Sequence, residues 1–515
     1  MESDRRIIRP SKRALRGLWI CWGLFLGWVQ LGNAQDPAVA LEGTLTRLIE
    51  QAEPSVVSIA RIRWQPGEPR VPSIKPFERG PFLATDPMPV DPEDPDFQPN
   101  TFGAGVIISG VRPQDRMVLT NYHVVQGGLI FGVAETEEAS RLFIRFSDRR
   151  SCFAKIIAAD PRSDLAVLSL ELAESKIDPA DLKPLDTFGS TPLRKGQLVV
   201  LLGNPYAIAH DGSASASWGM ISNLARRPLP WTDDENFQSM MYRLGNLVQI
   251  DGRLNLGGSG GPLLNLKGEL VGLTTSLAAI EGYEKSAGFA IPMDELTHRI
   301  VKSLVAGHEV EYGVLGILKP ETMTPAAFRK LNTGVDQASA ALVKSIQTDS
   351  PADRAGIRPL DIILKVGDVP IYSHTDLMRV VGLHPPESKV EITGWRADRG
   401  KFTTEAILGK WPVRDDIGII ETTPRYAPWR GISVDYSTGR QRYQAVGDPY
   451  RRAVLVTKVA PGSAGRAAEI QPGTYISQVN RIPVQTPGEF AEATKSLRGP
   501  VELRLNEGGK IIIGE

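Results

Sequence analysis

The sequence predicts a mainly β protein with one large β domain followed by two smaller modules. Short apolar or β-branched runs separated by turn residues fill residues 101–292, which is the pattern of an all-β sandwich or barrel. The 50 glycines and 39 prolines suit strands and turns better than a helical bundle. A weak internal duplication, residues 342–371 and 455–484, indicates two separate small domains.

Composition excludes several classes of function. The chain has 59 basic and 59 acidic side chains, so it carries no electrostatic footprint for nucleic acid, and we expect no nucleic-acid partner. The two cysteines, Cys21 and Cys152, exclude a scaffold held by several disulfides. Because no Cys/His spacing suggests a metal site, we expect neither a metal nor a cofactor.

The N-terminal segment has the layout of a secretory signal peptide. Basic residues between Arg5 and Arg16 precede an apolar run, Leu18 to Leu31, and small residues that suit a cleavage site. The apolar run is short for a membrane span. We therefore expect residues 1–34 to be a signal peptide, and an uncleaved membrane anchor is the alternative.

The remaining elements follow in order along the chain. Residues 41–52 have helical spacing and precede a strand over residues 55–64. The Pro-rich residues 65–100 show little apolar periodicity and predict an exposed loop. Residues 293–306 predict an amphipathic helix that closes the β domain. The expected domains are 36–306, 310–410 and 429–515, with a linker over 411–428.

Three segments of the β domain carry candidate catalytic residues, namely His123 at a strand end, Asp164 before an apolar strand and Ser259 among four glycines. Taken singly, such a histidine is more often a packed or capping group, and such an aspartate often only forms a turn. Together they supply a nucleophile, a base and a carboxylate that orients the base. The glycines would let the N–H groups of Gly257 and Ser259 converge as an oxyanion hole.

The sequence Gly257-x-Ser259-x-Gly261 also matches the nucleophile elbow of α/β-hydrolases. An elbow needs a helix after the serine, with the acid and the histidine downstream. Here two strands follow, around the turn at 265–268, and both partner residues lie upstream. The elbow interpretation therefore fails.

Five motifs occur in the order found in one protease family. These are LTNYHVV, DPRSDLAVL, GNP at 203–205, GGSGGPLLNLKGELVG and GFAIP at 288–292. They closely resemble the HtrA/Deg family of trypsin-like serine proteases. The resemblance implies a chymotrypsin-like domain of two six-stranded β-barrels followed by PDZ domains. It also implies that His123 is the general base, Asp164 the orienting acid and Ser259 the nucleophile, with Gly257 and Ser259 as oxyanion amides.

Two positions near the serine bear on activity and specificity. The family usually has Asn where this chain has Gly258, and a glycine there loosens the loop that forms the oxyanion hole. The floor of the family's S1 pocket corresponds to Leu254, which favours small or medium aliphatic P1 residues. A register shifted by one would place Arg253 there and favour acidic P1 residues instead.

Residues 312–317 (YGVLGI) and 430–434 (RGISV) resemble the carboxylate-binding loop of PDZ domains. By this resemblance Val314, Leu315, Gly316 and Ile317 would bind a peptide C-terminus, with the peptide added to the strand edge. The second module is looser, because Gly473-Thr474 replaces the usual Gly-Asp and residues 439–452 resemble an insertion. A purely structural second module is the alternative.

The resemblance implies an exported, periplasmic endopeptidase that degrades unfolded proteins captured through their C-termini. It also implies trimers or larger homo-oligomers. The alternative from another class is a PDZ-based chaperone or scaffold with weak or conditional protease activity, which Gly258 keeps open. An esterase of small substrates is a third alternative, disfavoured because its peptide-binding modules would have no role.

Overall fold

The computed structural model describes residues 36–63, 92, 99, 101–126, 140–186, 188–189, 191–204, 212–226, 247–252, 254, 257–275, 288–413, 418–444 and 450–515. The predicted signal peptide and nearly all of the predicted Pro-rich loop lie outside these residues. The chain divides into two compact units, Met1–Leu48 and Ile49–Glu515. The first described helix is α2 (Pro37–Ala52). None of the helices in the described ranges is both long enough and apolar enough to cross a membrane.

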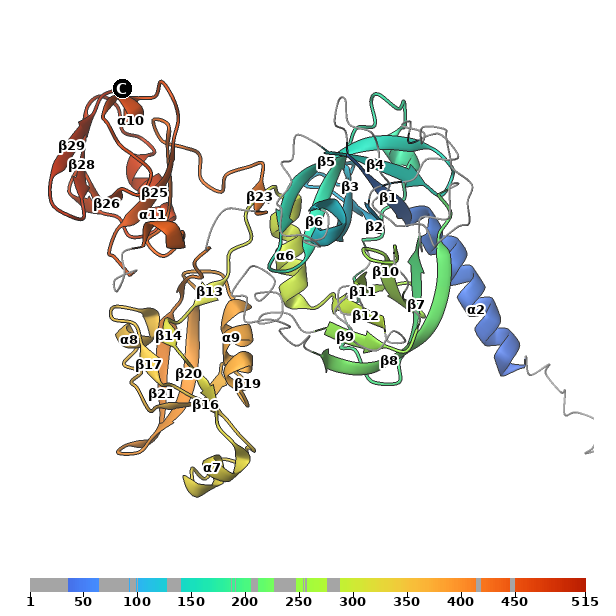
Figure 1. The fold of residues 1–515 in the computed structure, drawn as a ribbon, viewed down its shortest axis with the longest axis horizontal. Coiled ribbons are helices and arrows are strands. Elements are labelled where there is room, and N and C mark those ends of the chain that lie inside the picture. The colour runs from blue at the N-terminus through green and yellow to red at the C-terminus, as the bar shows by residue number, and fades with distance from the viewer. Residues whose placement is uncertain are drawn as a thin grey trace, which may run out of the picture. The chain divides into compact units, whose positions relative to one another are not determined.

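Six strands form the first barrel, with the order β5-β4-β1-β2-β3-β6 closed by pairing of β5 with β6 (Figure 1). Their apolar side chains alternate inward, as half-buried strands require, and the core includes Ile59, Ile107, Val118, Ile144 and Leu168. The strands are β1 (Val56–Arg63), β2 (Thr101–Ser109), β3 (Arg116–Asn121), β4 (Ser140–Phe146), β5 (Ser151–Asp160) and β6 (Leu165–Leu170).

The second barrel is also closed, in the order β10-β11-β12-β9-β8-β7. Helix α6 (Glu295–Val305) follows it and begins at Asp294, whose side chain accepts a hydrogen bond from Thr297 N–H. The two closed barrels confirm the predicted fold class. The strands are β7 (Leu198–Gly203), β8 (Ser215–Arg226), β9 (Leu247–Ile250), β10 (Pro262–Asn265), β11 (Leu270–Thr275) and β12 (Gly288–Pro292).

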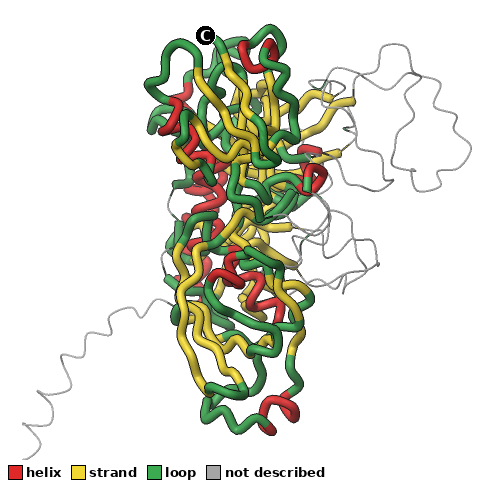
Figure 2. Tube along the Cα trace, turned by 90° about the vertical axis from the view of Figure 1, so that its left-hand side faces the viewer, coloured by secondary structure: helices red, strands yellow, loops and turns green. Residues whose placement is uncertain are grey.

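The internal duplication corresponds to two sheets of the same topology. The first module has the strand order β15-β16-β18-β20-β21 with β19 beside β18, and the second has β24-β25-β26-β28-β29 with β27 beside β26. Two short ribbons, β13–β22 and β14–β17, complete the first module. Strands predominate over helices throughout the described chain, as the yellow segments of Figure 2 show.

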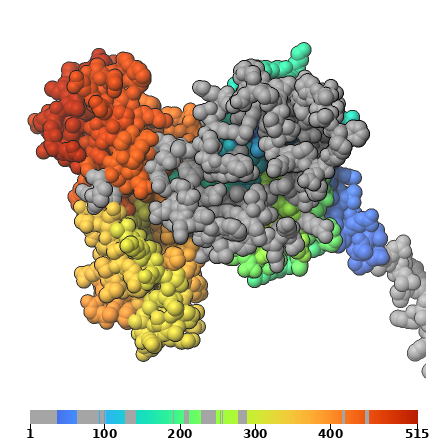
Figure 3. Space-filling view, in the orientation of Figure 1, coloured from blue at the N-terminus to red at the C-terminus, as the bar shows by residue number. Residues whose placement is uncertain are grey.

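The elements of the first module are β13 (Gly313–Val314), β14 (Ile317–Leu318), β15 (Glu321–Thr322), α7 (Pro325–Lys330), β16 (Ala341–Leu342), β17 (Ser345–Ile346), α8 (Pro351–Arg354), β18 (Ile362–Val366), β19 (Val369–Pro370), α9 (His374–Gly382), β20 (Lys389–Arg396), β21 (Gly400–Ile407) and β22 (Gly409–Lys410). Those of the second are β24 (Ile432–Tyr436), β25 (Val454–Val459), α10 (Ala464–Ala467), β26 (Tyr475–Val479), β27 (Ile482–Pro483), α11 (Pro487–Thr494), β28 (Val501–Leu505) and β29 (Lys510–Ile513). Their surfaces are yellow to orange and orange to red in Figure 3.

Part of the segment expected as a linker is a strand of the first barrel's sheet. Strand β23 (Ile420–Glu421) pairs with Ala158 and Ala159 of β5. The pairing of β4 with β5 ends at Ala154, so the later residues of β5 leave an edge that needs a partner. The polypeptide between the two modules therefore covers a barrel edge immediately before Asp160, the last residue of β5.

Candidate active site

Asp164 lies in the turn between β5 and β6 and is only 2% exposed. Its φ of 55° is in the left-handed region, which aspartate adopts more readily than most residues. Its backbone oxygen accepts hydrogen bonds from Tyr122 N–H at 3.0 Å and from the Asn121 amide at 3.1 Å. These hydrogen bonds attach the turn to the end of β3, and the carboxylate of Asp164 is buried.

His123 is the second residue of the short helix α3 (Tyr122–Gln126), which directly follows β3. Its Nδ1 lies 2.9 Å from both carboxylate oxygens of Asp164, and its backbone N–H donates to Oδ1 at 3.0 Å. An ionised carboxylate only accepts hydrogen bonds, so Nδ1 carries the proton in this contact. The other ring nitrogen, Nε2, is then an acceptor that can take a proton from a hydroxyl.

Ser259 lies on the turn before β10, with 2% of its surface exposed. Its carbonyl oxygen accepts a hydrogen bond from Ala104 N–H of β2 at 2.7 Å. At the neighbouring Gly103, a Cβ would lie 2.6 Å from Val124, which follows His123, and 3.1 Å from the Ser259 oxygen. The helix carrying His123 and the serine turn therefore both pack against Gly103, and only glycine leaves room for both.

The glycines around the serine have specific structural roles. Gly257 and Gly260 have φ values of 92° and 84°, and a side chain at either position would collide with a backbone carbonyl oxygen. The hydroxyl of Thr274 in β11 donates to the carbonyl oxygens of Gly258 and Gly261, at 2.6 and 2.9 Å. The turn is therefore attached to both barrels, while the assignment of the Gly257 and Ser259 amides as oxyanion donors stays a prediction.

Leu254, the predicted floor of the S1 pocket, is half-buried. It packs against the core of the second barrel together with Leu193 and Leu224. The competing residue, Arg253, lies outside the described residues. The specificity assignment therefore remains a prediction.

The structure adds a residue that the sequence analysis missed. Thr275, at the end of β11, is fully buried and donates from Oγ1 to Asp164 Oδ2 at 3.4 Å. No local pattern marks a threonine in an apolar strand as a partner of a remote aspartate. The thiol of Cys152 is also buried, and burial raises its pKa to about 12, which disfavours the reactive thiolate form of this residue.

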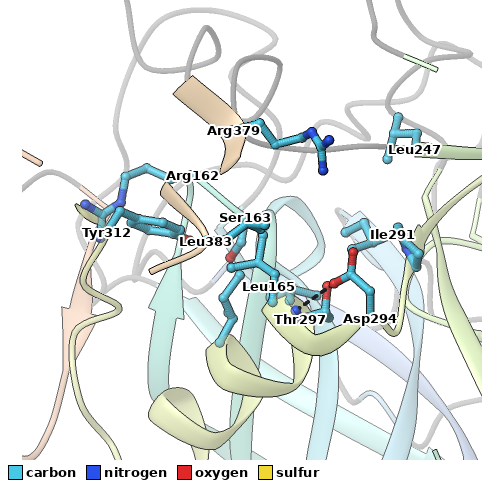
Figure 4. Close-up of a pocket in the computed structure, with 13 residues that line it drawn as sticks. Arg162, Ser163, Leu165, Leu247, Ile291, Asp294, Thr297, Tyr312, Arg379 and Leu383 are labelled. Atoms are coloured by element: carbon cyan, nitrogen blue, oxygen red, sulfur yellow. Dashed lines mark hydrogen bonds between the residues drawn. The ribbon is translucent and has the colours of Figure 1, made fainter. Parts of the chain in front are cut away.

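A hollow that is lined by none of His123, Asp164 and Ser259 lies beside residues of the turn that carries Asp164 (Figure 4). Arg162, Ser163 and Leu165 line it from that turn, and Arg379 lines it from α9. The guanidinium of Arg379 points into the hollow, and its Nε has no hydrogen-bond partner among the described residues. Within those residues, no cluster of three or more His, Cys, Asp or Glu side chains could hold a metal ion.

The predicted peptide-binding residues form one loop of the first module. Val314 pairs with Gly409, Leu315 O accepts from Ala352 N–H at 2.8 Å, and Gly316 has a φ of 77°. Ile317 begins β14, which pairs only with β17 among the described strands. The loop thus ends at a strand with one open edge.

Comparison with known proteins matches both kinds of domain. Residues 103–273 match the model of the trypsin-like peptidase domain, and residues 322–404 match the PDZ domain model. The "Probable periplasmic serine endoprotease DegP-like" of Pseudomonas fluorescens is 30% identical over 494 residues, 93% of this chain and 94% of that protein. The protein of the same name from Hahella chejuensis is 30% identical over 470 residues, 88% of each chain.

Among solved structures, "HtrA-type protease AlgW with decapeptide" is 24% identical, with a TM-score of 0.48, and the match covers 72% of this chain and 99% of that one. The sequence matches cover most of the chain, and the peptidase domain comes before the PDZ domain in both the matches and the structure. The two barrels and the contact between His123 and Asp164 are consistent with a trypsin-like peptidase domain. The chain therefore belongs to the HtrA/DegP family of trypsin-like serine endoproteases and carries a PDZ domain after its protease domain.

Proposed function

We propose that this endopeptidase degrades unfolded exported proteins by a triad of Ser259, His123 and Asp164. Ser259 attacks the peptide carbonyl while His123 Nε2 takes its proton and later returns it to the leaving amine. Asp164 keeps the imidazole in the required tautomer and stabilises the imidazolium. The N–H groups of Gly257 and Ser259 stabilise the oxyanion, and one such donor contributes about 3–4 kcal/mol in a serine protease.

One observation carries this proposal. Nδ1 of His123 contacts the carboxylate of Asp164 at 2.9 Å, and Asp164 is only 2% exposed. The turn that carries Ser259 and the helix α3 that carries His123 both pack against Gly103 of β2. A buried carboxylate fixed on one face of an imidazole is the arrangement that directs the opposite nitrogen to a hydroxyl. A turn-forming aspartate with no catalytic role would not require this contact.

For specificity, we propose small or medium aliphatic P1 residues, supported by the apolar Leu254 packed on the second barrel. Such side chains are usually buried in folded proteins, so cleavage selects for unfolded substrates. Residues 314–317 capture substrate C-termini in the first PDZ domain. The second module has the same strand order, and we propose that it is a second PDZ domain.

Location and assembly belong to the same proposal. The basic, apolar and small segments of residues 1–34 direct export, and the relatives named above are described as periplasmic. We propose a periplasmic enzyme that assembles as a trimer or a multiple of three. Analytical ultracentrifugation of the exported chain checks the assembly, and a monomer at all concentrations would contradict it.

Labelling with a fluorophosphonate probe tests the catalytic assignment directly. The full-length protein should be labelled, whereas Ser259→Ala should not, and His123→Ala should be labelled far more slowly. Ser213→Ala is a control serine outside the proposed triad and should be labelled like the wild type. If the wild type stays unlabelled even with an activating C-terminal peptide, the triad is not functional.

The alternative is a chaperone or scaffold, favoured by Gly258 in the turn beside the serine. Suppression of aggregation by Ser259→Ala without any casein digestion by the wild type would support this alternative. Digestion of casein together with slow turnover of p-nitrophenyl esters supports the protease. Fast ester turnover without casein digestion would instead indicate an esterase.

A further inference from the structure

The peptide-binding loop of the first module is held open by its backbone pairing. Gln347 N–H donates to Gly316 O at 2.9 Å, so the next pair, Ile317 and Ile346, is a non-hydrogen-bonded pair of an antiparallel ribbon. The N–H and C=O of Ile317 therefore face away from β17, toward the open edge. Val314, three residues earlier, cannot occupy them because it is paired with Gly409 of β22.

The corresponding loop of the second module is closed. Ala460 N–H donates to Gly431 O at 2.8 Å, so Ile432 has the same orientation as Ile317. However, Trp429 N–H donates to Ile432 O at 3.0 Å, and Ile432 N–H donates to Trp429 O at 2.9 Å. The intervening Arg430 and Gly431 both have positive φ, as a tight hairpin turn requires. Trp429 thus takes the backbone groups that an added peptide strand would use.

Side chains reinforce this closure. The ring of Trp429 packs edge-to-face on Phe490 of α11, with the centroids 6.1 Å apart. The guanidinium of Arg430 donates to the carbonyl oxygens of Gly499 and Ile513 at 2.7 and 2.8 Å. The two loops therefore present Ile317 and Ile432 in the same orientation. They differ in the partner of the residue three positions earlier, because Val314 pairs with Gly409 of β22 and Trp429 pairs with Ile432 itself.

Tyr450 of the second module lies where β22 meets the open loop. Its side chain is buried, with 8% of its surface exposed. A Cβ at Gly316 would lie 2.7 Å from the Tyr450 hydroxyl, and one at Gly409 would lie 3.4 Å from its ring. Tyr450 therefore covers both the loop and the strand that holds Val314.

An ion pair attaches the second module to the same strand. Lys410, the residue after Gly409, is 2% exposed, and its Nζ lies 3.0 Å from Asp435 Oδ1 of β24. A second contact joins the modules further along, because the hydroxyl of Tyr436 donates to Glu387 Oε1 at 2.6 Å. Strand β22 is thus held by the second module through a packed ring and a buried charge.

We propose that Tyr450 is a positioning residue for peptide capture, and that by this residue the second module keeps the peptide site of the first module open. The proposal rests on the proposed capture of C-termini by residues 314–317. With Tyr450 in place, β22 stays paired with Val314 and the N–H of Ile317 is presented to the peptide carboxylate. Without the ring, Val314 can leave β22 and close on Ile317 as Trp429 closes on Ile432, so the site loses preorganisation.

The test measures peptide binding by the full-length chain carrying Ser259→Ala, so that the probe is not cleaved. The probe is a fluorescein-labelled decapeptide ending in a free valine carboxylate, compared with the same peptide amidated at its C-terminus. We expect Tyr450→Ala to weaken binding of the free acid about tenfold, which corresponds to about 1.4 kcal/mol. Binding of the amide should change less, because its uncharged terminus forms a weaker hydrogen bond with the Ile317 N–H than a carboxylate does.

Two further variants separate positioning from general loss of structure. Tyr450→Phe keeps the ring and should bind the free acid within about twofold of the parent. Tyr443→Ala removes a ring that packs inside the second module on Ala453, Leu455 and Tyr475, and it should leave binding unchanged. Equal binding of the free acid by Tyr450→Ala and its parent would overturn the inference, as would a tenfold loss in Tyr450→Phe or Tyr443→Ala.

The outcome also distinguishes this inference from the function on which it rests. A parent chain that binds the free acid no better than the amide would contradict capture of C-termini and, with it, the role of Tyr450. A parent that prefers the free acid, with the same preference in Tyr450→Ala, would leave C-terminal capture intact and overturn only the role of the second module.

Discussion

The hydroxyl of Tyr312 donates a 2.6 Å hydrogen bond to Oδ2 of Asp160, which ends β5 four residues before the proposed catalytic acid. Both side chains are fully buried or nearly so. Arg162 donates to the other carboxylate oxygen at 2.7 Å and to Val310 O at 2.5 Å. The start of the turn that carries Asp164 is therefore held by residues that follow the protease domain.

Removal of the Tyr312 hydroxyl should reduce activity although none of the three proposed catalytic residues is itself substituted. In Tyr312→Phe, a buried carboxylate oxygen of Asp160 loses a donor, which costs about 1–3 kcal/mol. We expect kcat on a chromogenic peptide to fall about tenfold while KM changes little, because the turn carrying Asp164 is less well placed. Tyr372→Phe, whose side chain is exposed, is the control. A kcat equal to that of the wild type would show that the turn does not need this hydrogen bond.

Replacement of Asp164 by Asn should separate folding from catalysis. An amide at this position can donate to His123 Nδ1, so the imidazole adopts the tautomer that cannot accept the serine proton. We expect kcat to fall by a factor of about 10⁴, the loss that the equivalent substitution causes in a trypsin-like enzyme. The melting temperature of the full chain should stay within a few degrees. Asp148→Asn, at a half-exposed surface ion pair, should retain full activity.

Gly260 should not tolerate any side chain. Its φ is 84°, and a Cβ would collide with Ala104 O and with the Thr120 hydroxyl. Gly260→Ala should therefore abolish fluorophosphonate labelling and lower the melting temperature. Gly356→Ala is a matched control, since its φ is 75° and no atom lies within 4 Å of the added Cβ. That variant should show only the backbone cost of about 1–2 kcal/mol and keep its labelling. Equal effects in the two variants would argue against a steric role.

Glu309 should make stability depend on pH in the acid range. Lys410 Nζ lies 3.1 Å and Arg440 2.8 Å from its carboxylate. Burial alone would raise the pKa of Glu309, but the positive charges of Lys410, Arg440 and Arg162 outweigh it and hold the pKa well below the ordinary 4.5. The folded state then binds fewer protons than the unfolded state just below pH 4.5, so this stabilisation is present above that pH and is lost as the pH falls through the folded pKa.

The variant Glu309→Gln checks this dependence. At pH 7 it leaves Lys410 with less negative charge around it, and breaking such a buried network costs about 3–5 kcal/mol. Calorimetry at pH 7, 5, 4 and 3 should show that Glu309→Gln melts at a lower temperature than the wild type at pH 7. The difference between the two melting temperatures should become smaller below pH 4.5. Glu507→Gln, at an exposed position, should melt like the wild type. A difference in melting temperature that does not depend on pH would show that Glu309 is not responsible for the loss of stability in acid.

The candidate site was largely predictable because its residues carry local signatures. Glycines on both sides of Ser259 mark a backbone that must take positive φ, and the contact of His123 with Asp164 brings together two of the three residues that the motifs indicated. Thr275 could not be found in this way, because a buried threonine in an apolar strand looks the same whether or not its hydroxyl meets a remote carboxylate. The catalytic roles of His123, Asp164 and Ser259 remain predictions, as do those of Leu254 and the oxyanion amides.

The two C-terminal modules show where similar sequences diverge in structure. The loops at 312–317 and 430–434 both resemble a carboxylate-binding loop, yet Ile317 has an open edge and Ile432 is paired with Trp429. The segment 411–428 resembles a linker, and β23 within it completes the edge of β5. In each case the outcome depends on which backbone groups are left unpaired nearby.

The sequence alone was sufficient to predict the strands of both barrels and the internal duplication, and to propose the types of side chain for catalysis. Periodicity, turn glycines and nucleophile chemistry are properties of short segments, so they can be read without coordinates. Only the tertiary structure decided that Tyr312 holds Asp160, 152 residues away, and that Tyr450 covers Gly316. Contacts of this kind depend on how segments far apart in the sequence pack together. The sequence around either residue contains no pattern that identifies its partner.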